Sequence, residues 1–83
     1  MIAMTQRAST KLKRLRLELD PPISQEDFSR EAGIRLQVYG KAERGGKITY
    51  TTAIAILKAM NILRAKQRLN TFEHVEDLEM NIV

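Results

Sequence analysis

The feature that most constrains the fold is a pair of short helical patterns joined by a glycine-centred turn. Residues 25–32 read QEDFSREA and residues 36–44 read LQVYGKAER, with Gly33 at the start of the turn between them. Ser24 can cap the first helix, and Gly33 suits the left-handed conformation in which helices often end. Two helices joined this closely must cross steeply and share a small core. The pattern therefore predicts a helix-turn-helix unit.

The inner faces of these two helices carry residues of suitable size. Phe28 and Ala32 lie one turn apart on the first helix, and the small Ser29 stands where the helices would cross. Tyr39 and Ala42 give an inner face to the second helix, which is expected from Leu36 to Arg44. Together these side chains can form a shared core.

Three further helices are expected around this unit, over residues 9 or 10 to 19, 49 or 51 to 60, and 62 to 69 or 72. The sequence Asp20-Pro21-Pro22 ends the first of them, because proline disfavours a helical conformation in the residue before it. Hydrophobic residues make up 43% of the chain but aromatic residues only 5%, which favours helices over a sheet. A chain of 83 residues allows one domain. The sequence thus predicts an all-α fold, a compact four- to five-helix bundle with a central helix-turn-helix.

Several protein classes are disfavoured by what the sequence lacks. There is no cysteine, and therefore no disulfide framework, thiolate metal site or thiol nucleophile. His74 is the single histidine, and no phosphate-binding glycine loop or nucleophile-base pair accompanies it. No apolar run approaches the roughly 18 residues of a membrane span, and the first residues lack a secretory signal. We therefore expect a cytoplasmic protein with no cofactor, no metal and no enzymatic activity.

The net charge of +4 is distributed unevenly along the chain. All 14 Lys and Arg lie in residues 1–72, whereas residues 73–83 hold four acidic residues and no basic one. A basic body on a small helical domain suits a polyanion such as DNA. Charge alone fits an ordinary solvated surface equally well, so the functional assignment depends on the motif.

At this point the sequence resembles the phage repressor and Cro family of helix-turn-helix domains, also called the Xre family. The matching stretches are LKRLR, SQEDFSREAGI, ERG at residues 43–45, and TTAIAILKAMN. The resemblance covers residues 12–63 and is ungapped through 24–45, although the linker at residues 20–23 is about two residues longer than usual. It implies a lambda-repressor-like bundle whose third helix enters the major groove of DNA.

The resemblance further implies that the outward positions of the third helix meet bases: Arg35, Leu36, Gln37, Gly40 and Lys41. Gln37 can form two hydrogen bonds to adenine, and Lys41 can donate to guanine O6 and N7. Leu36 can pack on a thymine methyl, or it belongs to the core or to a protein interface. Gly40 costs about 0.5–1 kcal/mol relative to alanine in a helix. It either brings the backbone close to DNA or is a tolerated weak spot, and for Gln37 and Lys41 the alternative is a solvated face.

Three other residues are implied to contact phosphates, namely Gln25, Arg44 and Lys47. Gln25 would use its amide at the N-terminus of a helix, or it is simply a solvated polar residue. Arg44 and Lys47 can also stabilise a helix C-terminus as cations. Arg16 and Glu43 match the family's buried ion pair between the first and third helices, which has a structural role.

The expected organisation is an N-terminal arm over residues 1–8, a DNA-binding domain over 9–69, and an acidic C-terminal extension over 70–83. Apolar residues recur at every third position near the extension, a spacing that would line one helical stripe: Leu69, Phe72, Val75 and Leu78. This stripe forms a dimerisation or partner-binding segment, or it folds back on the core of the monomer.

The favoured interpretation is a sequence-specific regulator that binds double-stranded DNA. It would be a repressor of bacterial or phage type, associated with the nucleoid and acting as a homodimer on a pseudo-palindromic operator. The alternative is an antitoxin-type module that neutralises a partner toxin and autoregulates its operon. The acidic C-terminal extension with its apolar stripe is the feature that favours this alternative.

Overall fold

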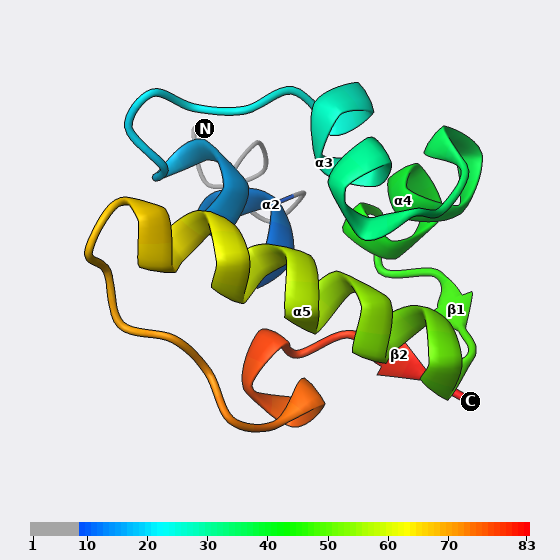
Figure 1. Ribbon diagram of the computed structural model, residues 1–83. Helices are drawn as coiled ribbons and strands as arrows, with labels where there is room; N and C mark the ends of the chain where they lie inside the picture. Colours follow the sequence, from blue (N-terminus) through cyan, green and yellow to red (C-terminus); the bar gives the residue numbers. More distant parts are fainter. Residues whose placement is uncertain (1–8) are drawn as a thin grey trace, which may run out of the picture.

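The computed structural model describes residues 9–83, in which four α-helices enclose one core (Figure 1). The helices are α2 (Lys11–Leu17), α3 (Gln25–Ala32), α4 (Leu36–Glu43) and α5 (Tyr50–Lys66). A 3-10 turn, η1 (Val75–Leu78), and two short strands, β1 (Lys47–Ile48) and β2 (Asn81–Ile82), complete the order. The expected all-α fold around a helix-turn-helix is confirmed. The expected N-terminal arm, residues 1–8, lies outside the described residues.

Side-chain caps begin three of the helices. The hydroxyl groups of Thr10, Ser24 and Thr49 each accept a hydrogen bond from the backbone N–H three residues later. Each cap contributes about 1 kcal/mol, because the first amides of a helix have no partner within it. α3 ends at Gly33, whose φ of 72° is left-handed. α3 therefore has its predicted bounds, whereas α4 ends one residue earlier than predicted.

The core forms where α3 crosses α4. The rings of Phe28 and Tyr39 stack with their centroids 4.7 Å apart, and both side chains are fully buried. Ser29 is also buried, and its hydroxyl donates a hydrogen bond to a carbonyl oxygen within α3. Leu12 from α2 and Ile56 from α5 pack in the same core, as α5 passes below α3 and α4 in Figure 1.

One continuous helix, α5, replaces the two helices that the sequence predicted between residues 49 and 72. The predicted break near Asn61 is wrong, since no proline or glycine interrupts this stretch. The Asn61 amide nitrogen donates to the Phe72 carbonyl oxygen (2.7 Å), and its oxygen accepts the Phe72 N–H (2.9 Å). α5 has 17 residues, and no helix within the described range is long and apolar enough to cross a membrane.

The first described helix also ends earlier than predicted, at Leu17 rather than Leu19. Leu17 is 49% exposed, whereas Leu19 follows the helix and remains 2% exposed in the core. The next residue, Asp20, donates its backbone N–H to the side-chain oxygen of Gln67 (2.8 Å). The linker between α2 and α3 is thereby attached to the end of α5.

The C-terminal segment folds back on the core of the monomer. Val75 and Leu78 are buried, and β2 pairs in parallel with β1, with Lys47 opposite Asn81. The predicted helical stripe is wrong, because a single 3-10 turn at η1 is the helical part of this segment. The sequence left two alternatives for these apolar residues, a surface for a partner or packing on the core of the monomer. Val75 and Leu78 pack on the core.

Leu78→Ala is expected to lower the free energy of unfolding by about 2–5 kcal/mol, because it leaves a cavity at a fully buried site. Urea denaturation followed by circular dichroism measures this change. Val83→Ala is the matched control in the same segment, since Val83 is 72% exposed and should change stability little. Equal stability of the two variants would show that the segment does not belong to the core.

Candidate nucleic-acid interface

The helix α4 has one buried face and one exposed face. Tyr39, Ala42 and Glu43 point into the protein, whereas the residues at its start and Lys41 are exposed. The exposed set includes Arg35, which is the N-cap residue, Leu36 and Gln37, and Leu36 is 43% exposed. Four of the five expected base-contacting residues therefore lie on one accessible surface, and Gly40 is the exception.

Gly40 is buried within α4. A Cβ placed on Gly40 would lie 3.3 Å from Nη1 of Arg44, which follows one helical turn later. The guanidinium of Arg44 therefore lies against the backbone of Gly40, on the same side of α4 as Lys41 and Gln37 by helical spacing. A direct approach of DNA to the Gly40 backbone requires Arg44 to move aside.

The carboxylate of Glu43 lies at the centre of a buried hydrogen-bond network. Arg16 donates from Nε to Oε2 (2.5 Å) and from Nη2 to Oε1 (3.2 Å), and the two side chains are 9% and 2% exposed. The Tyr39 hydroxyl donates to Oε2 (2.6 Å), and the Gln25 amide donates to Oε1 (2.7 Å). Arg16 also donates to the Ile23 carbonyl (2.8 Å). No buried side-chain polar atom in residues 9–83 is left without a hydrogen-bond partner.

This network shifts the pKa values of three of its members. Burial of the Glu43 carboxyl acts to raise its pKa, but hydrogen bonds from Arg16, Tyr39 and Gln25 outweigh it, so the pKa lies below its usual value. The hydrogen bond to Glu43 raises the pKa of Arg16. Burial raises the pKa of the Tyr39 hydroxyl, and the hydrogen bond to Glu43 raises it further. Glu43 is therefore held as an anion among donors that remain protonated.

The network includes one residue expected to contact phosphate. Gln25 is half-buried at the first position of α3. Its side-chain amide N–H donates a hydrogen bond to Glu43 rather than pointing away from the protein. No local pattern in the sequence indicates this contact, because Gln25 and Glu43 are 18 positions apart and meet only when α3 and α4 have packed together. Tyr39 was expected in the core, but its hydroxyl contact with Glu43 was missed, although the two residues lie one helical turn apart.

A two-glycine turn ends α4 and leads to β1. The Gly45 N–H donates to the Ala42 carbonyl (3.1 Å), and the Gly46 N–H donates to the Lys41 carbonyl (2.9 Å). This is the pairing of a Schellman motif, with Gly45 in the left-handed position at φ 85°. The Asn81 amide of β2 donates to the Gly45 carbonyl (3.2 Å), so the C-terminal segment contacts this turn directly.

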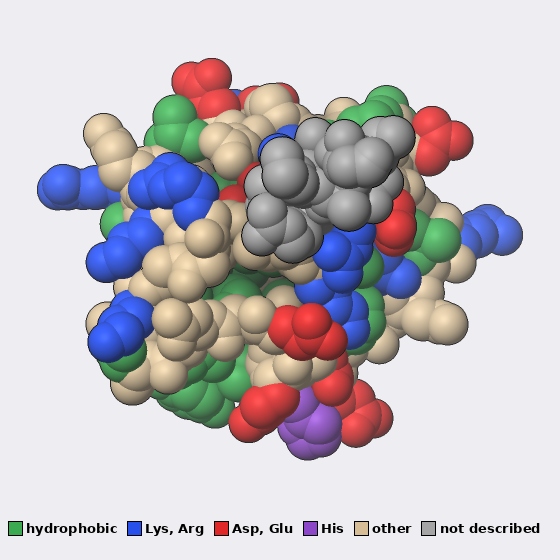
Figure 2. Space-filling view, turned by 180° about the vertical axis from the view of Figure 1, so that it is seen from behind, with side chains coloured by type: hydrophobic (Ala, Val, Ile, Leu, Met, Phe, Trp, Pro, Cys, Tyr) green, Lys and Arg blue, Asp and Glu red, His purple; other side chains and the backbone are tan. Residues whose placement is uncertain are grey.

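The charges around α4 and β1 are mostly positive. Lys41, Arg44 and Lys47 are all exposed within seven positions of one another. Figure 2 shows Lys and Arg side chains gathered at the edge where α4 and β1 lie, on the left of that view. Asp and Glu side chains surround the histidine at the lower edge, over η1. A polyanion would therefore be attracted to the α4 side of the molecule.

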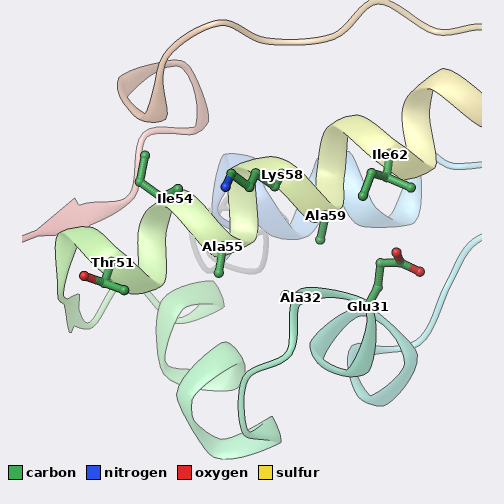
Figure 3. Close-up of a pocket in the computed structure, with 8 residues that line it drawn as sticks. All are labelled: Glu31, Ala32, Thr51, Ile54, Ala55, Lys58, Ala59 and Ile62. Carbon is green, nitrogen blue, oxygen red and sulfur yellow. The ribbon is translucent and has the colours of Figure 1, made fainter.

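The surface also has a groove of about 400 Å³ between α3 and α5 (Figure 3). Glu31 of α3 and Lys58 of α5 are the charged residues of its lining, and the remainder is small or apolar apart from Thr51. No cluster of three potential metal-ligating side chains occurs in residues 9–83.

Comparison with known families identifies this arrangement. A family model described as Helix-turn-helix matches residues 12–65, which span α2 to α5 and more than half of the chain. The chain belongs to the Xre-type helix-turn-helix family. As a member of this DNA-binding regulatory family, which is not a family of enzymes, the protein is a helix-turn-helix regulator that binds DNA. Comparisons with curated proteins and with solved structures gave no match.

Glu43→Gln is expected to lower the free energy of unfolding at pH 7 by about 3–5 kcal/mol, because it leaves the buried Arg16 without a counter-charge. The pKa of Glu43 is lower in the folded than in the unfolded protein, so its stabilisation is complete above about pH 4.5. That stabilisation is lost as the pH falls through the folded pKa.

The stability difference between the native protein and Glu43→Gln should therefore shrink below pH 4.5. Thermal unfolding between pH 7 and pH 3 measures it. Glu31→Gln serves as the control, since Glu31 is exposed and absent from the network. A difference that does not change with pH would show that the charge of Glu43 does not stabilise the fold.

Proposed function

We propose that the protein is a sequence-specific transcriptional regulator, a repressor that inserts α4 into the major groove of double-stranded DNA. The observation that carries the proposal is the exposed face of α4, whose opposite face is attached to α2 and α3 through Glu43. An anchored helix presents its outward side chains in one orientation, which base recognition requires. The basic residues beside it supply attraction for the phosphate backbone.

Individual side chains of this face match base edges. Gln37 is exposed and can pair with adenine, and exposed Lys41 can donate to guanine O6 and N7. Leu36 is 43% exposed at the start of α4, where it can pack on a thymine methyl. Arg44 and Lys47 are exposed beyond the helix and would contact phosphates. Phosphate contacts would set the register, and base contacts would set the preference.

The proposal includes a homodimer on a pseudo-palindromic operator. One recognition helix of eight residues contacts few base pairs, and two copies related by a two-fold axis double the sequence that is recognised. In such a complex the half-sites lie about one helical turn apart and in inverted order. The spacing of the half-sites therefore reports the distance between the two α4 helices of a dimer.

The antitoxin-type alternative loses part of its support. It depended on the acidic C-terminal segment with its apolar stripe as a surface for a partner protein. Val75 and Leu78 of that stripe lie in the core, and Phe72 is partly buried against it. Fewer apolar side chains are thus available for a toxin than the sequence indicated.

Selection of bound duplexes from a randomised pool, at about physiological salt, tests the proposal. Enrichment of inverted half-sites one turn apart is the expected result. Enrichment of a single half-site would remove the homodimer from the proposal. No enrichment by the folded protein would contradict sequence-specific binding altogether.

Lys41→Ala is expected to relax the preference at one base pair of each half-site, because a side chain that reads a base is removed. Arg44→Ala is expected to weaken binding to all duplexes alike and to reduce its salt dependence, because a phosphate contact is removed. Binding titrations with matched and mismatched duplexes at two salt concentrations separate the two effects. Equal losses on every duplex in both variants would overturn this assignment of roles.

A further inference from the structure

The two glycines that follow α4 are required for different reasons. Gly45 has a left-handed φ of 85°, and a Cβ placed on it would meet nothing within 4 Å. Gly46 is not left-handed, so its backbone conformation can accept a side chain. A Cβ on Gly46, however, would lie 2.5 Å from Cγ of Lys41, 3.1 Å from its carbonyl oxygen and 3.2 Å from its Cε. The backbone conformation explains the first glycine. Crowding against Lys41, most severe at Cγ of its side chain, explains the second.

The contact between Gly46 and Lys41 involves both backbone and side chain. The Gly46 N–H donates to the Lys41 carbonyl oxygen (2.9 Å), which closes the turn after α4. The aliphatic stem of Lys41 then lies in the space that a side chain at position 46 would occupy. A free lysine side chain samples many rotamers, and packing of the stem reduces that number. Lys41 nevertheless remains exposed to solvent.

We infer that Gly46 is a positioning residue for base recognition, because it seats the stem of Lys41 and thereby sets where the ammonium group meets the base edge. The inference rests on the proposed function, in which Lys41 reads a base. It adds a residue outside α4 to those that determine sequence preference. Gly46 itself contacts no DNA and acts through Lys41.

Gly46→Ala tests the inference in the full chain. Its methyl group displaces the stem of Lys41, and the expected result is a loss of about fivefold or more in preference at the base pair that Lys41→Ala relaxes. Duplex selection from the randomised pool gives the base preferences of both variants. Preferences at the other positions should stay unchanged, since Leu36 and Gln37 lie at the other end of α4.

Gly45→Ala is the matched control in the same turn. It strains a left-handed backbone, but its Cβ meets no neighbouring atom, so it should lower stability without changing the base preferences. A purely structural role of Gly46 would make the two alanine variants alike in preference. That result, or a Gly46→Ala protein with native preferences, would overturn the inference.

The double variant Lys41→Ala/Gly46→Ala provides the second test. Once the lysine stem is removed, the methyl group added at position 46 has no stem to displace, and the double variant should have the preferences of Lys41→Ala. The melting temperature should show the same coupling, with a decrease of about 4 °C or more for Gly46→Ala alone and a smaller decrease in the Lys41→Ala background, where only the contact with the carbonyl oxygen of residue 41 remains. An additive decrease in both readouts would contradict the inference.

The unfolding measurements also separate this inference from the proposed function. If the native protein selects no sequence, the proposed function fails, and the coupling in melting temperature still shows whether Gly46 seats Lys41. If Gly46→Ala does not fold, the double variant should fold, because the 2.5 Å contact with the Lys41 stem is absent and the 3.1 Å contact with the carbonyl oxygen of residue 41 needs a shift of only a few tenths of an ångström. Failure of the double variant to fold would overturn the inference.

Discussion

The buried carboxylate of Glu43 determines how α4 is held, and the orientation of the exposed face of α4 depends on it. Transfer of this charge from water to the protein interior costs several kcal/mol, and donors from α2, α3 and α4 itself offset that cost. Because hydrogen bonds are directional, the network is satisfied in one relative arrangement of these helices. The net stabilisation of such a pair is small compared with the cost of breaking it. Its main effect is therefore on orientation, since a rotation of α4 would leave buried charges unpaired.

The parts of this fold that could be predicted from the sequence are those with local causes. Ser24 as a cap and Gly33 as a left-handed end indicated the bounds of α3, because both signals act within one turn of the helix. The ion-pair residues Arg16 and Glu43 were recognised through the family resemblance, and the structure contains that pair. The hydrogen bond from the Gln25 amide to Glu43 could not be predicted in this way, since it depends on how α3 crosses α4.

The features that could not be predicted depend on contacts between distant residues. The predicted helix boundary lies at Asn61, but its side chain binds the backbone at Phe72, and no local pattern encodes that contact. The spacing of Val75 and Leu78 suggested a helical stripe. A single 3-10 turn also places residues three apart on the same side, so the same spacing occurs without a longer helix. Burial of Gly40 beneath Arg44 could not be predicted either, because sequence spacing shows that the two residues are neighbours but not where the guanidinium of Arg44 lies.

The parallel pairing of β1 with β2 has a consequence for the order in which the protein folds. A ribosome synthesises residues 24–45 before β2, so the turn after α4 lacks its contact from Asn81 until residue 81 has been added. Contacts between positions this far apart also close slowly, because a long loop must first be ordered. The α4 helix should therefore reach its final stability only after β2 has been synthesised, although the helix itself is complete about 40 residues earlier.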